Sequence, residues 1–292
     1  MNQVKTVALL GMLSGLLVAI GYAAFGGTSG ALMGLMMAAV MNLGSWYFSD
    51  KIALAAYGAQ PVTEAEAPDL HRLVKQLSDR AQIPMPALYV VPNPGANAFA
   101  TGRDPNHAAV AVTSGIVDLL SEAELEAVIA HELSHVANRD TLTQAVAATI
   151  GGAISYLANM VMWFGVAQDD EDGNGNGLVF LLTAIVAPLA ATVIQLGISR
   201  TREFSADAGA AKLTGNPRAL VSALQRLEAN AQRVPFAAQN PAFSPLLIVN
   251  PLSKQFLANL FSTHPSTEAR VAKLLELEQE LMSSGEKPSL NF

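Results

Sequence analysis

The chain has 292 residues, of which 51% are hydrophobic and 14% are charged, and its mean hydropathy is +0.33. Soluble domains usually carry about 25% charged residues, so we expect part of this chain to lie in lipid. A net charge of −7 with no cluster of Lys and Arg argues against a nucleic-acid partner. The absence of cysteine excludes disulfides and thiolate ligands, so a bound metal would need His, Asp, Glu or main-chain donors.

Four stretches are long and apolar enough to span a bilayer, which takes about 20 residues. They cover residues 7–26, 31–48, 143–166 and 178–198. The short link at 27–30 predicts a helical hairpin, and Gly11-x-x-x-Gly15 and Gly30-x-x-x-Gly34 predict that its helices approach closely. A cleaved signal peptide is the alternative for the first stretch, and a buried core helix for each of the others. A second span follows the first stretch at once, which disfavours the signal peptide.

Lys and Arg near the ends of the spans predict the orientation of the chain in the membrane. These residues are Lys5, Lys51, Arg139, Arg200 and Arg202, whereas the tips of both predicted hairpins have no Lys or Arg. We therefore expect both termini, and the polar segments that follow the second and fourth spans, to be cytoplasmic.

The polar segments predict a mainly α-helical fold with a small β-sheet. Apolar periodicity predicts a helix over 63–80, and short β-rich runs predict strands over 88–91, 98–100 and 108–112. Ser121 with Glu124 forms a capping box, which predicts a helix that ends near Asn138. Further helices are expected over 202–213, after the cap Asn216 and after Pro265, with a loop over 235–260.

This pattern divides the chain into four parts. Residues 1–50 form a transmembrane hairpin, and residues 142–199 form a second one. Residues 51–141 and 200–292 are expected to form the two parts of one catalytic domain, brought together by the second hairpin.

The segment His131-Glu132-Leu133-Ser134-His135 carries the main chemical signal. On a helix, His131 and His135 lie on one face, and this spacing can place two imidazole nitrogens on one zinc ion. Glu132 lies about 100° further round the helix, where it can act as a general base on water. The alternative is a helix in which both histidines are satisfied polar groups without a metal.

A catalytic zinc site needs a third protein ligand and an open position. The second hairpin should return Glu203 to the membrane face where His135 lies, so we expect Glu203 to be that ligand. Asp207, one helical turn further on, suits a carboxylate that orients a ligating histidine. The alternative is that Glu203 and Asp207 are solvated and pair with Arg200 or Arg202.

Together, these features resemble the HtpX-type membrane metalloproteases, relatives of the CAAX prenyl endopeptidases. The likeness rests on residues 131–135, the apolar hairpin after them and the run Arg202-Glu203-Phe204-Ser205-Ala206-Asp207, and it extends over nearly the whole chain. It implies a zincin-like, cytoplasm-facing zinc endopeptidase of the bacterial inner membrane, with one Zn²⁺ per chain. It also implies a role in membrane-protein quality control and in the response to stress.

The resemblance implies further site residues. It matches His131, His135 and Glu203 to the zinc ligands and Glu132 to the base. Residues 93–100 are similar to a segment that forms an edge strand beside the zinc, where a peptide can add as a strand and Asn97 can bind it. His264 is similar to a histidine near the metal that could donate to the oxyanion, and Arg270 belongs to the same motif as a candidate substrate-binding residue. A turn Asn and a His at a helix start are the alternatives.

The sequence leaves three hypotheses open. The first is a zinc endopeptidase that cuts membrane proteins or unfolded polypeptides in the bilayer. The second is a non-enzymatic membrane scaffold or chaperone with a structural metal or none. The third is a processing peptidase for prenylated CAAX substrates.

Overall fold

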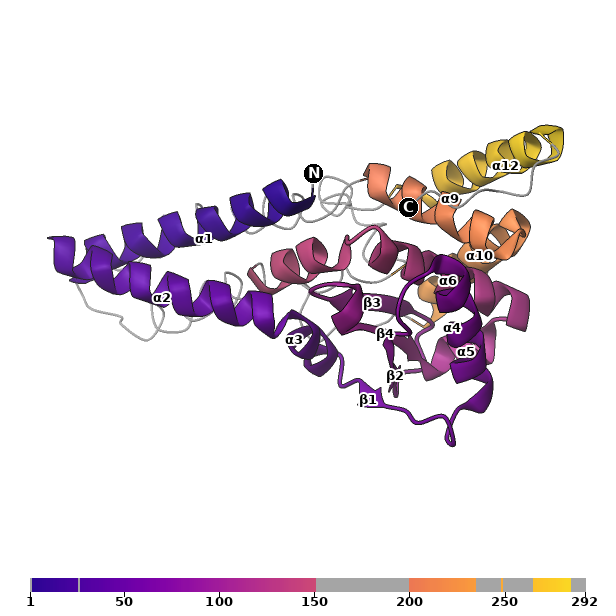
Figure 1. Cartoon of the computed structure of the whole chain (residues 1–292), viewed down its shortest axis with the longest axis horizontal. Coiled ribbons are helices and arrows are strands. Elements are labelled where there is room, and N and C mark those ends of the chain that lie inside the picture. The colour runs from indigo at the N-terminus through magenta and orange to yellow at the C-terminus, as the bar shows by residue number, and fades with distance from the viewer. Residues whose placement is uncertain (1, 26, 151–199, 235–247, 249–264, 285–292) are drawn as a thin grey trace.

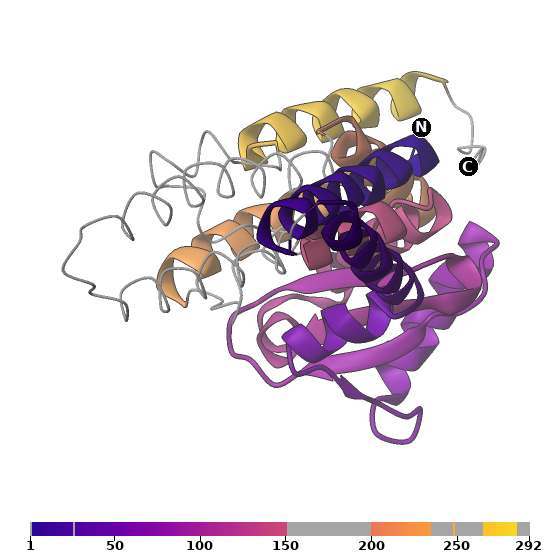
Figure 2. The same ribbon diagram turned by 90° about the vertical axis from the view of Figure 1, so that its left-hand side faces the viewer.

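The computed structural model of the chain describes residues 2–25, 27–150, 200–234, 248 and 265–284. In this part of the chain most residues are helical and one small sheet is present, as predicted (Figure 1). A helical hairpin extends away from the part that holds the sheet. In the view along that hairpin, the C-terminal helix and the strands lie on opposite sides of the molecule (Figure 2).

The hairpin consists of α1 (Asn2–Phe25) and α2 (Gly27–Tyr47), which pack closely through glycines. A Cβ atom on Gly34 would lie 2.3 Å from the carbonyl oxygen of Leu17, and one on Gly21 would lie 2.3 Å from that of Gly30. The predicted close approach is therefore confirmed at Gly30 and Gly34. It is wrong for Gly11-x-x-x-Gly15, where an added Cβ atom meets nothing within 4 Å.

The predicted link at 27–30 is also wrong, because α2 begins at Gly27. Polar contacts add to the hairpin packing, with the Asn42 Nδ2 donating to Ser14 Oγ at 2.9 Å. A helix over Thr141–Ile150 lies against the same hairpin, and the hydroxyls of Thr6 and Thr143 are 3.0 Å apart. These contacts connect the α1–α2 hairpin to the helix that follows residues 131–135.

Among the described residues, α2 is the one helix long and apolar enough to cross a membrane by length and composition. The apolar runs Thr6–Ala19 and Thr141–Ile150 are shorter. Most of the predicted third span and all of the fourth lie outside the described residues. Four spans are therefore not confirmed.

The sheet has the strand order β1-β2-β4-β3 and contains β1 (Gln60–Pro61), β2 (Ala87–Val91), β3 (Ala98–Gly102) and β4 (Ala108–Thr113). β2 and β4 are parallel, while β3 pairs antiparallel with β4 through Ala98↔Val112. A 3₁₀ turn, Pro105–His107, lies in the loop between β3 and β4. The predicted edge strand is confirmed, because β3 forms one edge of the sheet.

Helices cover both faces of the sheet. The larger apolar core lies between the sheet and α4 (Pro68–Ala81), α6 (Glu122–Ala137), α9 (Arg200–Thr214) and α10 (Pro217–Arg233). A smaller core on the other side contains α3 (Ser49–Ala56), Tyr57 and Phe99. The C-terminal helix is α12 (Thr267–Ser284).

One expected helix needs correction, and two helices were not predicted from the sequence. The helix predicted over 63–80 begins at Pro68, because proline favours the first helical position and the preceding residues form a turn. The sequence did not reveal α3, which continues directly from the apolar run of α2. It also did not reveal α5 (Ser114–Leu119), which is too short to show a helical period.

The capping box of α6 does more than begin a helix. Glu124 accepts from the main-chain N–H of Ser121 at 2.8 Å, as predicted. The same carboxylate accepts from Ser222 Oγ at 2.5 Å and from Arg226 at 2.7 Å, both on α10. Burial opposes its ionisation, but these hydrogen bonds and the Arg226 charge outweigh burial and lower the pKa of Glu124. Glu124 therefore fastens α10 to the start of the helix that carries residues 131–135.

We expect Glu124→Ala to lower the free energy of unfolding by about 1–3 kcal/mol, because it removes a helix cap and the acceptor that Ser222 and Arg226 share. Thermal unfolding in detergent measures this change. A depressed pKa in the folded state contributes stability above the unfolded pKa of a Glu, so the difference from the parent should shrink as the pH falls through the folded pKa. Glu122→Ala, in the same first turn but exposed, is the matched control. Equal losses for both variants would contradict this role.

Candidate metal centre

Helix α6 presents two imidazoles on one buried face. The ring centroids of His131 and His135 are 4.8 Å apart, with the rings nearly perpendicular at 89°. The two side chains are 1% and 4% exposed, so neither is solvated. The i, i+4 spacing therefore places both rings together, as predicted from the sequence.

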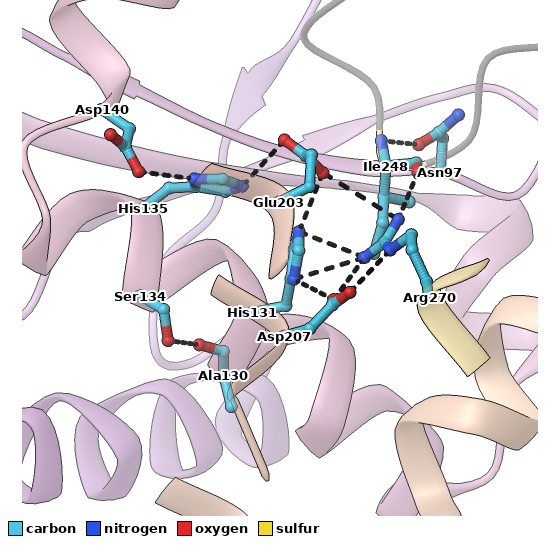
Figure 3. Close-up of polar contacts among 10 residues, drawn as sticks. All are labelled: Asn97, Ala130, His131, Ser134, His135, Asp140, Glu203, Asp207, Ile248 and Arg270. Atoms are coloured by element: carbon cyan, nitrogen blue, oxygen red, sulfur yellow. Dashed lines mark hydrogen bonds and ion pairs between the residues drawn. The ribbon is translucent and has the colours of Figure 1, made fainter. Parts of the chain in front are cut away.

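Helix α9 packs against α6 and brings Glu203 between the two imidazoles (Figure 3). Its carboxylate oxygens lie 3.7 Å from His131 Nε2 and 3.6 Å from His135 Nε2. One candidate ligand atom from each of the three residues lies within 4.8 Å of the others. Ligands of a tetrahedral zinc ion, each about 2.0–2.2 Å from the metal, are about 3.3–3.6 Å from one another. The separations of 3.7 and 3.6 Å between Glu203 and the two rings therefore suit a shared ion better than a direct hydrogen bond.

The far nitrogen of each ring contacts its own carboxylate. His131 Nδ1 lies 2.9 Å from Asp207 Oδ1, and His135 Nδ1 lies 3.1 Å from Asp140 Oδ2. Such a partner holds the proton on Nδ1 and leaves Nε2 as the free donor atom for a metal. Asp207 thus lies beside a histidine, as expected from the sequence. The contact of Asp140 with His135 was not predicted. The one signal that could have indicated it is the position of Asp140 soon after the end of α6.

Each of these carboxylates has a buried arginine beside it. Arg270 donates to Asp207 Oδ1 at 2.6 Å and to Oδ2 at 2.9 Å. Arg202 NH1 lies 3.8 Å from Asp140 Oδ1. Arg202 therefore does not pair with Glu203 or Asp207 as a solvated residue, since it is 8% exposed. Arg270 is likewise buried on the side of His131 that faces Asp207.

The cluster is short of positive charge. Among the described residues it buries four carboxylates and two guanidiniums: Glu132, Asp140, Glu203, Asp207, Arg202 and Arg270. With both histidines neutral, these six groups carry a formal net charge of −2, because four are carboxylates and two are guanidiniums. Buried charges in proteins are paired or coordinate a metal. A divalent cation held by the three ligands would bring this cluster to neutrality, so the residues fit a zinc ion in charge as well as in geometry.

The pKa values show the same imbalance. Burial raises the pKa of Glu132 to about 7, and the Glu203 carboxylate adds to the effect. Burial opposes the charged form of His135, but the hydrogen bond with Asp140 and the Glu203 charge outweigh it and raise the pKa to about 9. Both groups hold a proton more readily than usual, as expected where positive charge is lacking.

The other histidine differs because its carboxylate already has a strong cation. Burial lowers the pKa of His131 to about 4, although its hydrogen bond with Asp207 opposes this. Burial would raise the pKa of Asp207, but Arg270 and His131 outweigh it and lower the value to about 2. Asp207 is therefore ionised, and His131 is neutral as a metal ligand must be.

Glu132 lies between this cluster and the sheet. Its carboxylate accepts a hydrogen bond from the main-chain N–H of Ala100 on β3, and its side chain is 3% exposed. The edge strand that could bind a peptide thus touches the candidate base directly. This contact could not be predicted from the sequence, because it depends on how α6 packs against β3.

Asn97 lies just before β3, at the same edge. Its Oδ1 accepts from the main-chain N–H of Ile248 at 3.0 Å, and Ile248 also donates to the carbonyl of Ala98 at 3.3 Å. Arg270 NH1 donates to the carbonyl of Ile248 at 3.2 Å. Asn97 and Arg270 were predicted to bind substrate. In this structure both form hydrogen bonds with the main chain of Ile248. His264 lies outside the described residues.

Comparison with known proteins agrees with the site. The family model "Peptidase family M48" matches residues 64–278. Proteins named "Protease HtpX homolog" are similar over almost their whole length. The one from Nostoc punctiforme is 68% identical over 96% of this chain and 98% of its own. Those from Acaryochloris marina and Ralstonia pickettii are 57% and 48% identical, covering 100% and 95% of this chain and 99% and 97% of their own.

The crystal structure of S. mikatae Ste24p has the same fold. It superposes with a TM-score of 0.51 at 19% identity, over 94% of this chain. The chain spans 65% of the length of that protein. The family match covers most of the sequence, including every described residue of the metal centre, and the relatives that share it are proteases. The chain therefore belongs to peptidase family M48 and is a metallopeptidase.

Proposed function

We propose that the chain is a zinc endopeptidase of the bacterial inner membrane that cuts membrane proteins or unfolded polypeptides. His131, His135 and Glu203 would hold one zinc ion. The observation that carries the proposal is the buried cluster in which three ligand atoms converge among four carboxylates and two guanidiniums. The absence of cysteine also leaves His and carboxylate as the donors, a set that zinc accepts.

A bound zinc ion would polarise the scissile carbonyl and make water a better nucleophile at neutral pH. The proposed role of Glu132 is to take the proton from the attacking water and to pass it to the leaving amine. Its burial supports this role, because a raised pKa makes a carboxylate a stronger base. The Ala100 N–H holds its carboxylate at the sheet edge.

A peptide substrate would lie along β3. Residues alternate in direction along a strand, and the main chain of Ala98 already bonds outward to Ile248, away from β4. A substrate strand added there would run past Glu132. Asn97 is a candidate for holding its main chain, as it holds that of Ile248. His264 stays a predicted oxyanion donor. We propose that Arg270 acts through Asp207 and His131, rather than on the substrate.

The length and apolar composition of α2 support the membrane location, and so do the exposed apolar side chains of this helix, such as Leu35, Met36 and Val40. The charge pattern near the predicted spans favours a cytoplasmic site. The role in quality control and stress is proposed from the likeness to the HtpX proteases. Membership of a peptidase family disfavours a non-catalytic scaffold. The likeness to Ste24p concerns the fold alone, so it does not favour CAAX processing.

We expect Glu132→Gln to reduce kcat about 10²–10⁴-fold, because it removes a general base while leaving all three ligands in place. Zinc content per chain should stay at the wild-type level. The measurement is cleavage of an unfolded test protein by the full-length enzyme in detergent, with metal analysis of the same sample. Glu122→Gln, an exposed change on the same helix, is the control. Wild-type cleavage by Glu132→Gln would show that this residue is not the base.

Removal of any ligand should act on the metal itself. His131→Ala, His135→Ala and Glu203→Ala are each expected to lose most of the bound zinc, whereas Glu132→Gln keeps it, because two protein ligands hold zinc far more weakly than three. Equilibrium dialysis against a zinc buffer measures the occupancy. If all three variants bound one zinc per chain as tightly as the parent, the assigned ligand set would be wrong.

Arg270 offers a test of the buried ion pair. Arg270→Met should destabilise the protein by about 3–5 kcal/mol, because it leaves the Asp207 charge buried without its strongest partner. The double variant Asp207→Asn with Arg270→Met should recover part of the loss. Arg218→Met, which breaks the exposed pair with Glu278, should cost about 0–1 kcal/mol. Thermal unfolding compares the three, and equal effects of Arg270→Met and Arg218→Met would contradict the account.

A further inference from the structure

The end of helix α6 has an unusual backbone. Arg139 adopts a left-handed conformation with φ of +58°, which residues other than glycine rarely do. Its N–H donates to the carbonyl of Val136 at 3.1 Å, and the N–H of Asp140 donates to that of His135 at 2.9 Å. These two bonds form a Schellman motif, a helix end that usually places glycine at the left-handed position. The chain therefore reverses sharply just after the second histidine.

This reversal places Asp140 beside the histidine five residues earlier. The main chain of Asp140 bonds to the carbonyl of His135, and its carboxylate Oδ2 lies 3.1 Å from His135 Nδ1. The side chain is buried at 1% exposed. A helix that simply continued past Asn138 would carry Asp140 to a different face from His135. The left-handed turn at Arg139 is thus what allows the contact.

Arg202 holds the other side of this carboxylate. It comes from α9, one residue before Glu203, and its guanidinium lies 3.8 Å from Asp140 Oδ1. Burial lowers the pKa of Arg202, while the Asp140 and Glu203 charges oppose this. Asp140 is therefore fixed by contacts to both helices that supply the proposed ligands.

The two histidines have equivalent partners. His131 contacts Asp207, which pairs with Arg270, and His135 contacts Asp140 (Figure 3). Asp140 in turn lies beside Arg202. In each case a carboxylate on Nδ1 leaves Nε2 facing Glu203. Carboxylates in this position orient the ring and make it a stronger ligand, and their loss typically costs about 10–100-fold in metal affinity.

We infer that Asp140 is a positioning residue that orients His135 for metal binding, and that the left-handed turn at Arg139 and the cation of Arg202 hold it in place. The inference rests on the proposed zinc function of the same site. Asp140 does not touch the substrate. Asp140 and Arg202 thus form a carboxylate–guanidinium pair beside His135, one of the proposed ligands.

The experiment measures zinc affinity by competition with a chromophoric chelator, using the full chain in detergent. We expect Asp140→Ala to weaken zinc binding about 10–100-fold. Asp140→Asn keeps an acceptor oxygen for Nδ1–H and should recover most of the affinity. The absorption spectrum of the cobalt-substituted protein should change in Asp140→Ala and return toward the wild type in Asp140→Asn. A purely structural role would not give this recovery with a spectral change.

The turn can be tested without touching the carboxylate. Arg139→Gly removes the charge but favours the left-handed conformation, so zinc affinity should stay within about 2-fold of the wild type. Arg139→Val removes the same charge but opposes that conformation, so it should weaken zinc binding as Asp140→Ala does. Equal affinity in both Arg139 variants would overturn the role of the turn. Thermal unfolding of each variant shows whether it folds. If Arg139→Val unfolds early, Arg139→Ala takes its place, because it removes the same charge and also disfavours the left-handed conformation.

His135→Ala separates failure of this inference from failure of the proposed function. If Asp140→Ala binds zinc as tightly as the wild type while His135→Ala does not bind it, Asp140 is not a positioning residue and the zinc site stands. If His135→Ala also binds zinc with wild-type affinity, the proposed ligand set fails, and the inference fails with it.

Discussion

A buried excess of negative charge is the constraint on which the rest of the structure depends. Four carboxylates and two guanidiniums are buried where α6 and α9 meet, next to two imidazoles. Buried charge of one sign is costly in a protein interior, and a divalent cation held there would offset the excess. Two neighbouring helices hold the site together. The Glu124 bridge fastens α10 to α6, and Arg270 on α12 pairs with Asp207.

The same packing connects the candidate metal centre with the sheet and with the α1–α2 hairpin. Glu132 is bonded to Ala100 on the edge strand, and Thr141, which follows Asp140, donates to the carbonyl of Gly102 at the end of that strand. Arg103 stacks on Tyr47 at the end of α2, with its guanidinium carbon 4.8 Å from the ring centroid. Strand β3 therefore lies next to the proposed base and runs toward the end of the helix that can cross a membrane.

The parts of the site that depend on local spacing could be predicted from the sequence, because i, i+4 histidines and a capping box act within one helix. Glu203 was also predictable, from the expectation that an apolar hairpin returns the chain. Asp140 was not, because its place depends on a left-handed Arg139 that no composition reveals. Arg202 looked like a cation that marks membrane topology, since only tertiary packing shows that it is buried. The glycine contact in α1 lies at Gly21 rather than at Gly11 or Gly15, because the way α1 packs against α2 decides which glycine meets the other helix, and no local pattern reveals that packing.

X-ray absorption at the zinc edge of the purified full-length protein tests whether His131, His135 and Glu203 hold a zinc ion. We expect one zinc per chain, bound by two imidazoles and by carboxylate oxygen at about 2.0–2.2 Å. We also expect a single imidazole for any zinc that remains in His135→Ala. Zinc bound by two imidazoles in that variant, or by no imidazole in the parent, would contradict the account.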